Sequence, residues 1–157
     1  MLAGLLTTGL VTARADLKVG DPLPDLAACK LAGKLPDSLV GKVVLLDFWA
    51  SWCDSCEAAF PVLDALQKKY GPAGLVIIAV NVDDSQADME KFLNTHPVAF
   101  FTVQDARQYL GDKVNVSVMP TSFLTGRDGK VAYLHNGFNS AQSPPAYEQE
   151  ITALLKP

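Results

Sequence analysis

Two cysteines three positions apart, Cys53 and Cys56, are the residues of this sequence best suited to chemistry. They follow an apolar, β-rich run at 43–49, and helix-forming residues at 57–70 come next. Side chains three apart at the start of a helix share a face, so the two sulfurs can close a small disulfide ring. The unpaired N–H groups there, together with the helix dipole, favour a thiolate. The spacing predicts thiol–disulfide exchange, with a structural disulfide or a zinc site as alternatives.

Thiol–disulfide exchange requires two different roles from the two cysteines. One exposed thiolate attacks a disulfide, and a second thiol resolves the mixed disulfide that forms. Cys53 lies nearer the expected helix tip and is predicted to attack. Cys56 lies one turn further in and is predicted to be more buried and to resolve.

The surroundings of the cysteines resemble a known family. The run LDFWASWCDSC at 46–56 is similar to the active-site run of the thioredoxin superfamily, especially its exported TlpA/ResA-type thiol–disulfide oxidoreductases. Pro61 stands five residues after Cys56, where thioredoxins carry a helix-kinking proline. The resemblance extends over 19–156. It implies a thioredoxin fold and a redox-active Cys53–Cys56 disulfide that requires no organic cofactor or metal.

The residues between the cysteines depart from the family pattern, which usually places a proline before the second cysteine. Here they are Asp54 and Ser55. The negative charge of Asp54 should raise the pKa of Cys53 and oppose the helix dipole. This favours a reductant nearer thioredoxin than a strong oxidase.

Two acidic residues are candidate catalytic groups. Asp47 stands six residues before Cys53 in an otherwise apolar strand, where a carboxylate is costly without a partner or a function. Its position resembles the buried aspartate that assists proton transfer with the resolving cysteine of thioredoxins; the alternative is a solvated residue at a strand edge. Asp84 resembles the acidic residue that the ResA-like branch places near the disulfide; the alternative is a helix cap.

Substrate binding is expected at two further places. Met119-Pro120-Thr121 resembles the segment that carries the cis-proline of the superfamily. The resemblance implies that Pro120 is cis and that Met119 offers backbone groups to an extended substrate chain. Trp52 is expected to flank the exposed sulfur, whereas Trp49 belongs to the core.

The first fifteen residues predict an export signal. Residues 2–11 are apolar, and Ala13-Arg14-Ala15 is an A-x-A cleavage site, although no Lys or Arg follows Met1 before the apolar run. The stretch is too short to span a bilayer. We expect a signal peptide at 1–15, a thioredoxin-like domain at 16–157 and a periplasmic location; membrane association requires that the N-terminal segment is retained as an anchor.

The remaining soft or nitrogen ligands lack a clear site. Cys29 is assigned to an N-terminal hairpin and to partial burial; a lipidated cysteine or an extra redox or intermolecular role is the alternative. His96 and His135 are expected to end a helix and a strand. None of the three has close metal-ligand spacing, so we predict no metal.

Composition supports one globular domain. Of 157 residues, 49% are hydrophobic and 19% are charged, which argues against disorder. The net charge of −4 without a Lys/Arg run gives no reason to expect nucleic-acid binding. Strands alternating with helices predict an α/β three-layer domain with a mixed central sheet, an N-terminal β-hairpin and a helical insertion. The expected hairpin spans 19–35; expected strands are 43–49, 75–82, 98–103, 121–125 and 130–135, and expected helices are 53–70, 86–95, 105–110 and 146–155.

These observations predict an exported thiol–disulfide oxidoreductase that reduces protein disulfides through Cys53 and Cys56. By resemblance, its substrates are cysteine-containing exported proteins such as apocytochrome c or its maturation partners. A membrane thiol-transfer protein would supply the reducing equivalents. The alternatives are a thiol peroxidase and a metal- or haem-handling chaperone that uses the same two cysteines.

Overall fold

Strand β2 (Val43–Trp49) lies in the middle of a six-stranded sheet of order β1-β4-β3-β2-β5-β6. The computed structural model describes residues 16–156. β2 pairs in parallel with β3 (Leu75–Asn81) and antiparallel with β5 (Thr121–Thr125), and every residue of β2 is buried. An unbroken apolar run is the sequence of a strand covered on both faces. The mixed sheet confirms the predicted α/β class.

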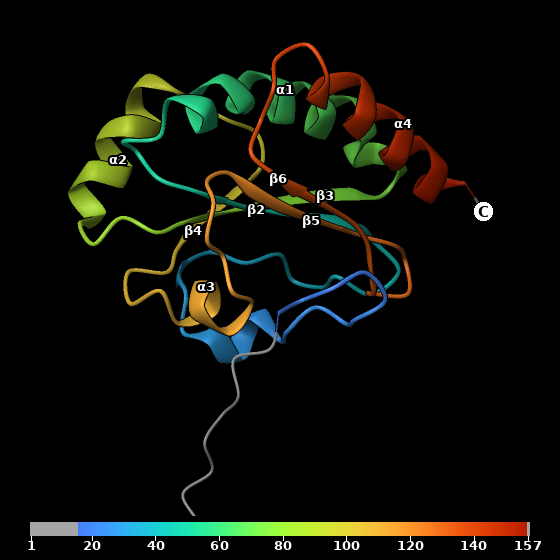
Figure 1. Ribbon diagram of the computed structural model, residues 1–157, viewed down its shortest axis with the longest axis horizontal. Coiled ribbons are helices and arrows are strands. Elements are labelled where there is room, and N and C mark those ends of the chain that lie inside the picture. Colours follow the sequence, from blue (N-terminus) through green and yellow to red (C-terminus); the bar gives the residue numbers. More distant parts are fainter. Residues whose placement is uncertain (1–15, 157) are drawn as a thin grey trace, which may run out of the picture.

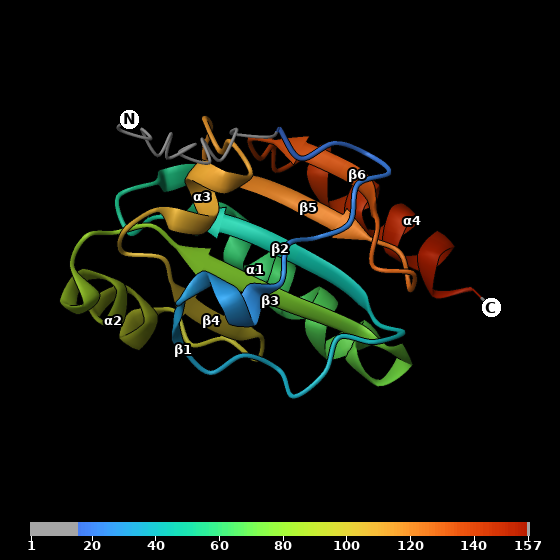
Figure 2. The same ribbon diagram turned by 90° about the horizontal axis from the view of Figure 1, so that it is seen from below.

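Helices cover both faces of this sheet, which gives the predicted three layers (Figure 1). Helices α1, α2 and α4 lie over one face, whereas α3 and the 3₁₀ turn η1 lie over the other (Figures 1 and 2). Among residues 16–156, no helix is long and apolar enough to cross a membrane. The other elements are η1 (Leu26–Cys29), β1 (Ala32–Gly33), α1 (Asp54–Tyr70), η2 (Gly71–Ala73), α2 (Gln86–Thr95), β4 (Phe101–Gln104), α3 (Tyr109–Lys113), β6 (Val131–Asn136) and α4 (Ser143–Leu155).

An aromatic cluster joins β2 to the helices above it. The ring of Trp49 lies 4.7 Å from that of Phe60 on α1 and 4.9 Å from that of Phe92 on α2, measured between centroids. Residues two apart in a strand project to the same face. Asp47 therefore projects into the same helix-covered layer as Trp49.

Helix α1 carries the two cysteines at its start. Cys53 is its N-cap residue, and Cys56, Phe60 and Leu63 form the buried face that packs on the sheet. The helix includes Pro61, as the resemblance implies, and ends at Tyr70, as predicted. These three residues are spaced i, i+4, i+7, so they lie on one side of the helix, and Cys56 faces the sheet with the other two.

The predicted N-terminal hairpin at 19–35 is wrong, because its two halves do not pair with each other. Pro22 bridges to Lys130, whereas β1 pairs with β4. Prolines lack the N–H that a ladder requires, and the side chain of Asp25 accepts a hydrogen bond from the N–H of Ala27 and so begins η1.

Cys29, the last residue of η1, is fully buried rather than partly buried. The predicted signal peptide at 1–15 lies outside the described residues.

Three other predicted boundaries also differ, each for a local reason. The helix expected at 105–110 is α3, because the Asp105 carboxylate accepts from the N–H groups of residues 109, 110 and 111 and precedes the helix as a cap. The strand expected at 98–103 begins later, since the N–H of Ala99 donates to Asp64 on α1. Helix α4 begins three residues before Ala146, because prolines in the first turn lose no hydrogen bond.

Candidate active site

The sulfurs of Cys53 and Cys56 are joined in a disulfide, with their Cα atoms 5.2 Å apart. The backbone N–H of Cys56 points at the sulfur of Cys53, 3.2 Å away, and the carbonyl of Cys53 accepts the first helical hydrogen bonds. An N–H aimed at a sulfur stabilises the thiolate that reduction would leave there.

The two cysteines differ in access. Cys53 retains 8% of its surface exposed, whereas Cys56 retains none. A substrate sulfur can reach only the first of them without a change in structure. This ordering supports the predicted roles, with Cys53 attacking and Cys56 resolving.

The Met119–Pro120 peptide bond is cis, as predicted, and it lies beside the disulfide. The connection is Ser55, whose hydroxyl donates to the carbonyl of Met119 at 3.4 Å and lies 3.4 Å from the sulfur of Cys53. The carbonyl of Pro120 is already paired, because it accepts from the N–H of Gly137 at 2.7 Å. The cis-proline segment and the cysteines thus form one site.

Apolar side chains border this site. Trp52 is 70% exposed and directly precedes Cys53, whereas Trp49 is fully buried, so the two tryptophans take the places expected of them. Val118 is exposed and Met119 is half-buried next to Pro120. Exposed apolar groups around a reactive sulfur provide a surface on which a protein substrate can bury its own apolar residues.

Asp47 is buried, with 1% of its surface exposed. Burial raises its pKa to about 7, and a hydrogen bond from the Ser122 hydroxyl opposes that rise. The bond joins Ser122 Oγ to Asp47 Oδ1 at 2.6 Å. Among the residues described, Oδ2 of Asp47 has no hydrogen-bond partner. The edge position weighed for Asp47 does not occur, because β2 is the central strand.

Asp83, which the sequence interpretation did not single out, holds the loop before the cysteines. Both of its carboxylate oxygens accept from the N–H of Ser51 at 3.1 Å, and one also accepts from the amide of Asn81 at 2.9 Å. Asp84, the predicted site residue, is exposed and directly follows it. The side chain that caps α2 is that of Ser85. The pattern N-x-D at the end of a buried strand is the signal that could have identified Asp83.

The remaining candidate ligands are dispersed. Cys29 donates its S–H to the carbonyl of Asp25 at 3.2 Å, and burial raises its pKa. His96 bonds to Glu57 at 3.0 Å, and His135 bonds to Glu150 at 2.7 Å. Within 16–156, no group of three or more His, Cys, Asp or Glu side chains is arranged to hold a metal ion.

Comparisons with known proteins agree with this arrangement. Residues 41–131 match the model of a protein family described as thioredoxin-like. The chain is 31% identical over 149 residues to the thiol-disulfide oxidoreductase ResA of Bacillus thuringiensis, covering 94% of this chain and 86% of that one. It is 33% identical over 133 residues to ResA of Geobacillus kaustophilus, covering 83% of this chain and 76% of that one.

A solved structure is similar to this chain in both fold and sequence. A Chlorobium tepidum protein assigned as the thiol:disulfide interchange protein DsbE superposes with a TM-score of 0.83 at 40% identity, covering 90% of this chain and all of that one.

Proposed function

This chain belongs to the thioredoxin-like family and is a thiol–disulfide oxidoreductase of the ResA/DsbE type, and we propose that it works as a reductase of exported proteins. Enzymes of this class act on cysteine-containing substrate proteins. The observation that carries the proposal is the accessible sulfur of Cys53, which caps α1 beside the cis-proline segment.

The reaction transfers two electrons from the dithiol of this chain to a substrate disulfide. The Cys53 thiolate attacks one substrate sulfur, and the other substrate sulfur leaves as a thiolate that takes up a proton. The Cys56 thiol then loses its proton and attacks the sulfur of Cys53. The second substrate sulfur leaves, and the chain returns to the disulfide seen in this structure.

Three groups assist these steps in the proposal. Asp47 accepts the proton of Cys56, since both side chains project into the layer between the sheet and α1, and a carboxyl with a pKa of about 7 can exchange a proton near neutral pH. The backbone of Met119, beside the exposed ring of Trp52, pairs with the extended chain of the substrate. Asp84 keeps its proposed role as an acidic group near the site, at an exposed position.

The proposed location is the periplasm, because residues 1–15 have the composition of an export signal and reductases of this kind act where disulfides persist. A membrane thiol-transfer protein would return electrons to Cys53 and Cys56. The proposed substrate class is apocytochrome c or a protein of its maturation, since haem attaches to a reduced C-x-x-C-H segment. The reduced dithiol of Cys53 and Cys56 itself carries both electrons, so the proposal includes no organic cofactor or metal.

The test is reduction of an oxidised C-x-x-C-H peptide by the reduced protein. Cys56→Ser should trap a mixed disulfide with the peptide, Cys53→Ser should be inactive, and Cys29→Ser is the matched control that should behave as the unaltered chain. Saturable peroxide consumption without peptide reduction, or a stoichiometric metal lost in Cys53→Ser, would contradict the proposal in favour of the peroxidase or the chaperone.

A further inference from the structure

Three buried polar side chains form a column through the apolar layer between the sheet and α4. Asp47 on β2, Ser122 on β5 and Tyr147 on α4 are each only 1% exposed. Ser122 Oγ lies 2.6 Å from Asp47 Oδ1 and 2.9 Å from the hydroxyl of Tyr147. Asp47 and Ser122 are direct partners in the β2–β5 register, so the backbone itself sets the first of these bonds.

The donors in this column can point only one way while Asp47 is ionised. A carboxylate only accepts, so Ser122 must donate to it. The Ser122 oxygen is then free to accept, and Tyr147 donates to it. Tyr147 stays protonated, since burial and the nearby charge of Asp47 raise its pKa. Two hydroxyls in series therefore stabilise the ionised carboxylate.

No cation takes part in this arrangement. Within the described chain no Lys, Arg or His bonds to Asp47, and its register partner on the other side, on β3, is Ala79. The titratable group that faces Asp47 is Tyr147 from α4, and Cys56 lies on the buried side of α1 over the same face of the sheet. The hydroxyl column is the only polar support of Asp47 among residues 16–156.

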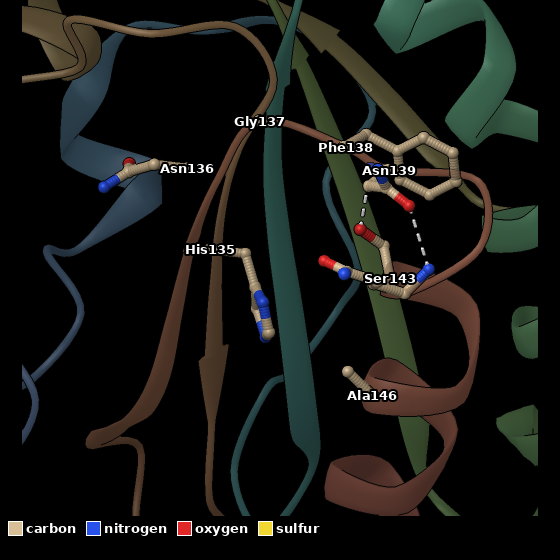
Figure 3. A pocket seen from close by; sticks show the side chains of 8 residues that line it. His135, Asn136, Gly137, Phe138, Asn139, Ser143 and Ala146 are labelled. Atoms are coloured by element: carbon tan, nitrogen blue, oxygen red, sulfur yellow. Dashed lines mark hydrogen bonds between the residues drawn. The ribbon is translucent and has the colours of Figure 1, made fainter.

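The hydrogen-bonded side chains of His135 and Glu150 lie at the outer end of the column. The ring of His135 packs edge-on against Tyr147, 4.7 Å between centroids, and bonds to Glu150 at 2.7 Å. His135 also lines a surface hollow of about 430 Å³ between the end of β6 and the start of α4, opposite Ser143 and Ala146 (Figure 3). Because His135 and Glu150 bond to each other, they leave Tyr147 to donate inward.

We propose that Ser122 and Tyr147 are positioning residues for the exchange reaction, which hold Asp47 so that Oδ1 is occupied and Oδ2 takes the proton of Cys56. The inference rests on the proposed function. In the step it describes, the S–H bond of Cys56 breaks and an O–H bond forms at Oδ2. The electron pair left on Cys56 forms the bond to the sulfur of Cys53, and the substrate sulfur leaves with the pair of the bond that breaks. The two hydroxyls keep the carboxylate a weak enough base to release that proton near neutral pH.

The test follows the resolving step alone. Reduced protein reacts with 5,5′-dithiobis(2-nitrobenzoate) in two stages: Cys53 releases one thionitrobenzoate, and Cys56 releases the second by attacking the Cys53 mixed disulfide. Stopped-flow absorbance across pH 5–9 gives the pH midpoint of the second stage.

Removing a donor should move that midpoint to higher pH. We expect Ser122→Ala to lower the second-stage rate at least about tenfold at pH 6, the loss expected for one hydrogen bond to an ionised group. Tyr147→Phe should move the midpoint in the same direction but less. Ser122→Thr keeps the hydroxyl and should have the midpoint of the unaltered protein. Thr125→Val is the matched control, because it removes another buried hydroxyl of β5 that bonds only to the backbone of Val44.

The dependence on Asp47 provides the decisive comparison. In an Asp47→Asn background, Ser122→Ala should cause no further shift. Superimposable profiles of unaltered, Ser122→Ala and Tyr147→Phe proteins would overturn the inference, as would an equal shift in the Asp47→Asn background. Tyr147→Phe preserves the packing, so its pH midpoint tests the inference if Ser122→Ala does not fold. Failure of the unaltered protein to release either thionitrobenzoate would instead contradict the proposed function.

Discussion

The hydroxyl of Ser55 lies 3.4 Å from both the carbonyl oxygen of Met119 and the sulfur of Cys53. It stands directly before Cys56, where the resemblance to thioredoxins implies a proline, which has no side-chain donor. In the disulfide form the hydroxyl donates to Met119. When Cys53 becomes a thiolate, the same hydroxyl can turn to the stronger acceptor.

Ser55→Ala should therefore make the Cys53 thiolate less stable. We expect alkylation of reduced protein by iodoacetamide at pH 7 to slow about fivefold, the equivalent of about 1 kcal/mol for one hydrogen bond. Ser140→Ala, at an exposed position of the loop before α4, is the control and should not change the rate. An unchanged rate in Ser55→Ala would show that the hydroxyl stays with Met119.

Asp83 should be far more important for stability than its neighbour Asp84. Asp83→Ala removes the acceptor of the half-buried Ser51 N–H and of the buried side-chain amide of Asn81, which should cost about 2 kcal/mol. Asp84→Ala changes an exposed side chain and should stay within about 0.5 kcal/mol. Urea unfolding at pH 7 gives both values. Equal losses in the two variants would contradict the assignment of the loop anchor to Asp83.

The stability of the disulfide form should fall as the pH rises toward 7. The pKa of Asp47 is near 3.8 when unperturbed and about 7 in the folded chain, so between these values the unfolded chain binds fewer protons. Stability is lost with rising pH wherever the unfolded state binds fewer protons. The full effect is about 4 kcal/mol, since one pKa unit corresponds to about 1.4 kcal/mol.

Asp47→Asn isolates this contribution. The free energy of unfolding of the unaltered protein should drop between pH 4 and pH 8 relative to that of Asp47→Asn, measured with urea on the oxidised form. Parallel pH dependences of the two proteins would mean that Asp47 is ionised in the folded chain well below pH 7.

Cys29 should be inert in the folded protein. Its thiol is 1% exposed, donates to the carbonyl of Asp25, and has a pKa raised by burial. In the reduced protein we expect 5,5′-dithiobis(2-nitrobenzoate) to release two thionitrobenzoates under native conditions, through Cys53 and then Cys56, and Cys29 to react only in denaturant. Cys29→Ala should leave the reduction potential of the other pair unchanged. Reaction of Cys29 at a rate near that of Cys53 would instead support a redox role for it.

Strong local patterns made much of the fold predictable. The apolar run of β2 and the helix-forming residues of α1 are each continuous in the sequence, so short-range reasoning identified these elements. The resemblance carried by residues 46–56 supplied the fold, and that of residues 119–121 supplied the cis bond before Pro120. The prediction for the N-terminal segment failed because Lys130 lies 108 residues after Pro22 and β4 lies about 70 residues after β1, so these pairings leave no local sign.

The residues that hold the site in place were harder to predict from the sequence. Asp47 was identified because a charge in an apolar run is conspicuous, but its partner Ser122 is an ordinary strand residue until the β2–β5 register is known. Tyr147 has the spacing of any core residue of a helix. Asp83 and Asp84 are chemically identical, and only the exact end of β3 decides which of them turns inward.

The most direct test of the central claim is the reduction potential of the Cys53–Cys56 pair, obtained by equilibration with dithiothreitol and glutathione buffers, with Cys29→Ser alongside. A reversible two-electron couple near about −270 mV, the thioredoxin range, is the predicted result and supports a reductase. A value near about −120 mV would reverse the direction of electron flow. The absence of a reversible couple would contradict thiol–disulfide exchange altogether.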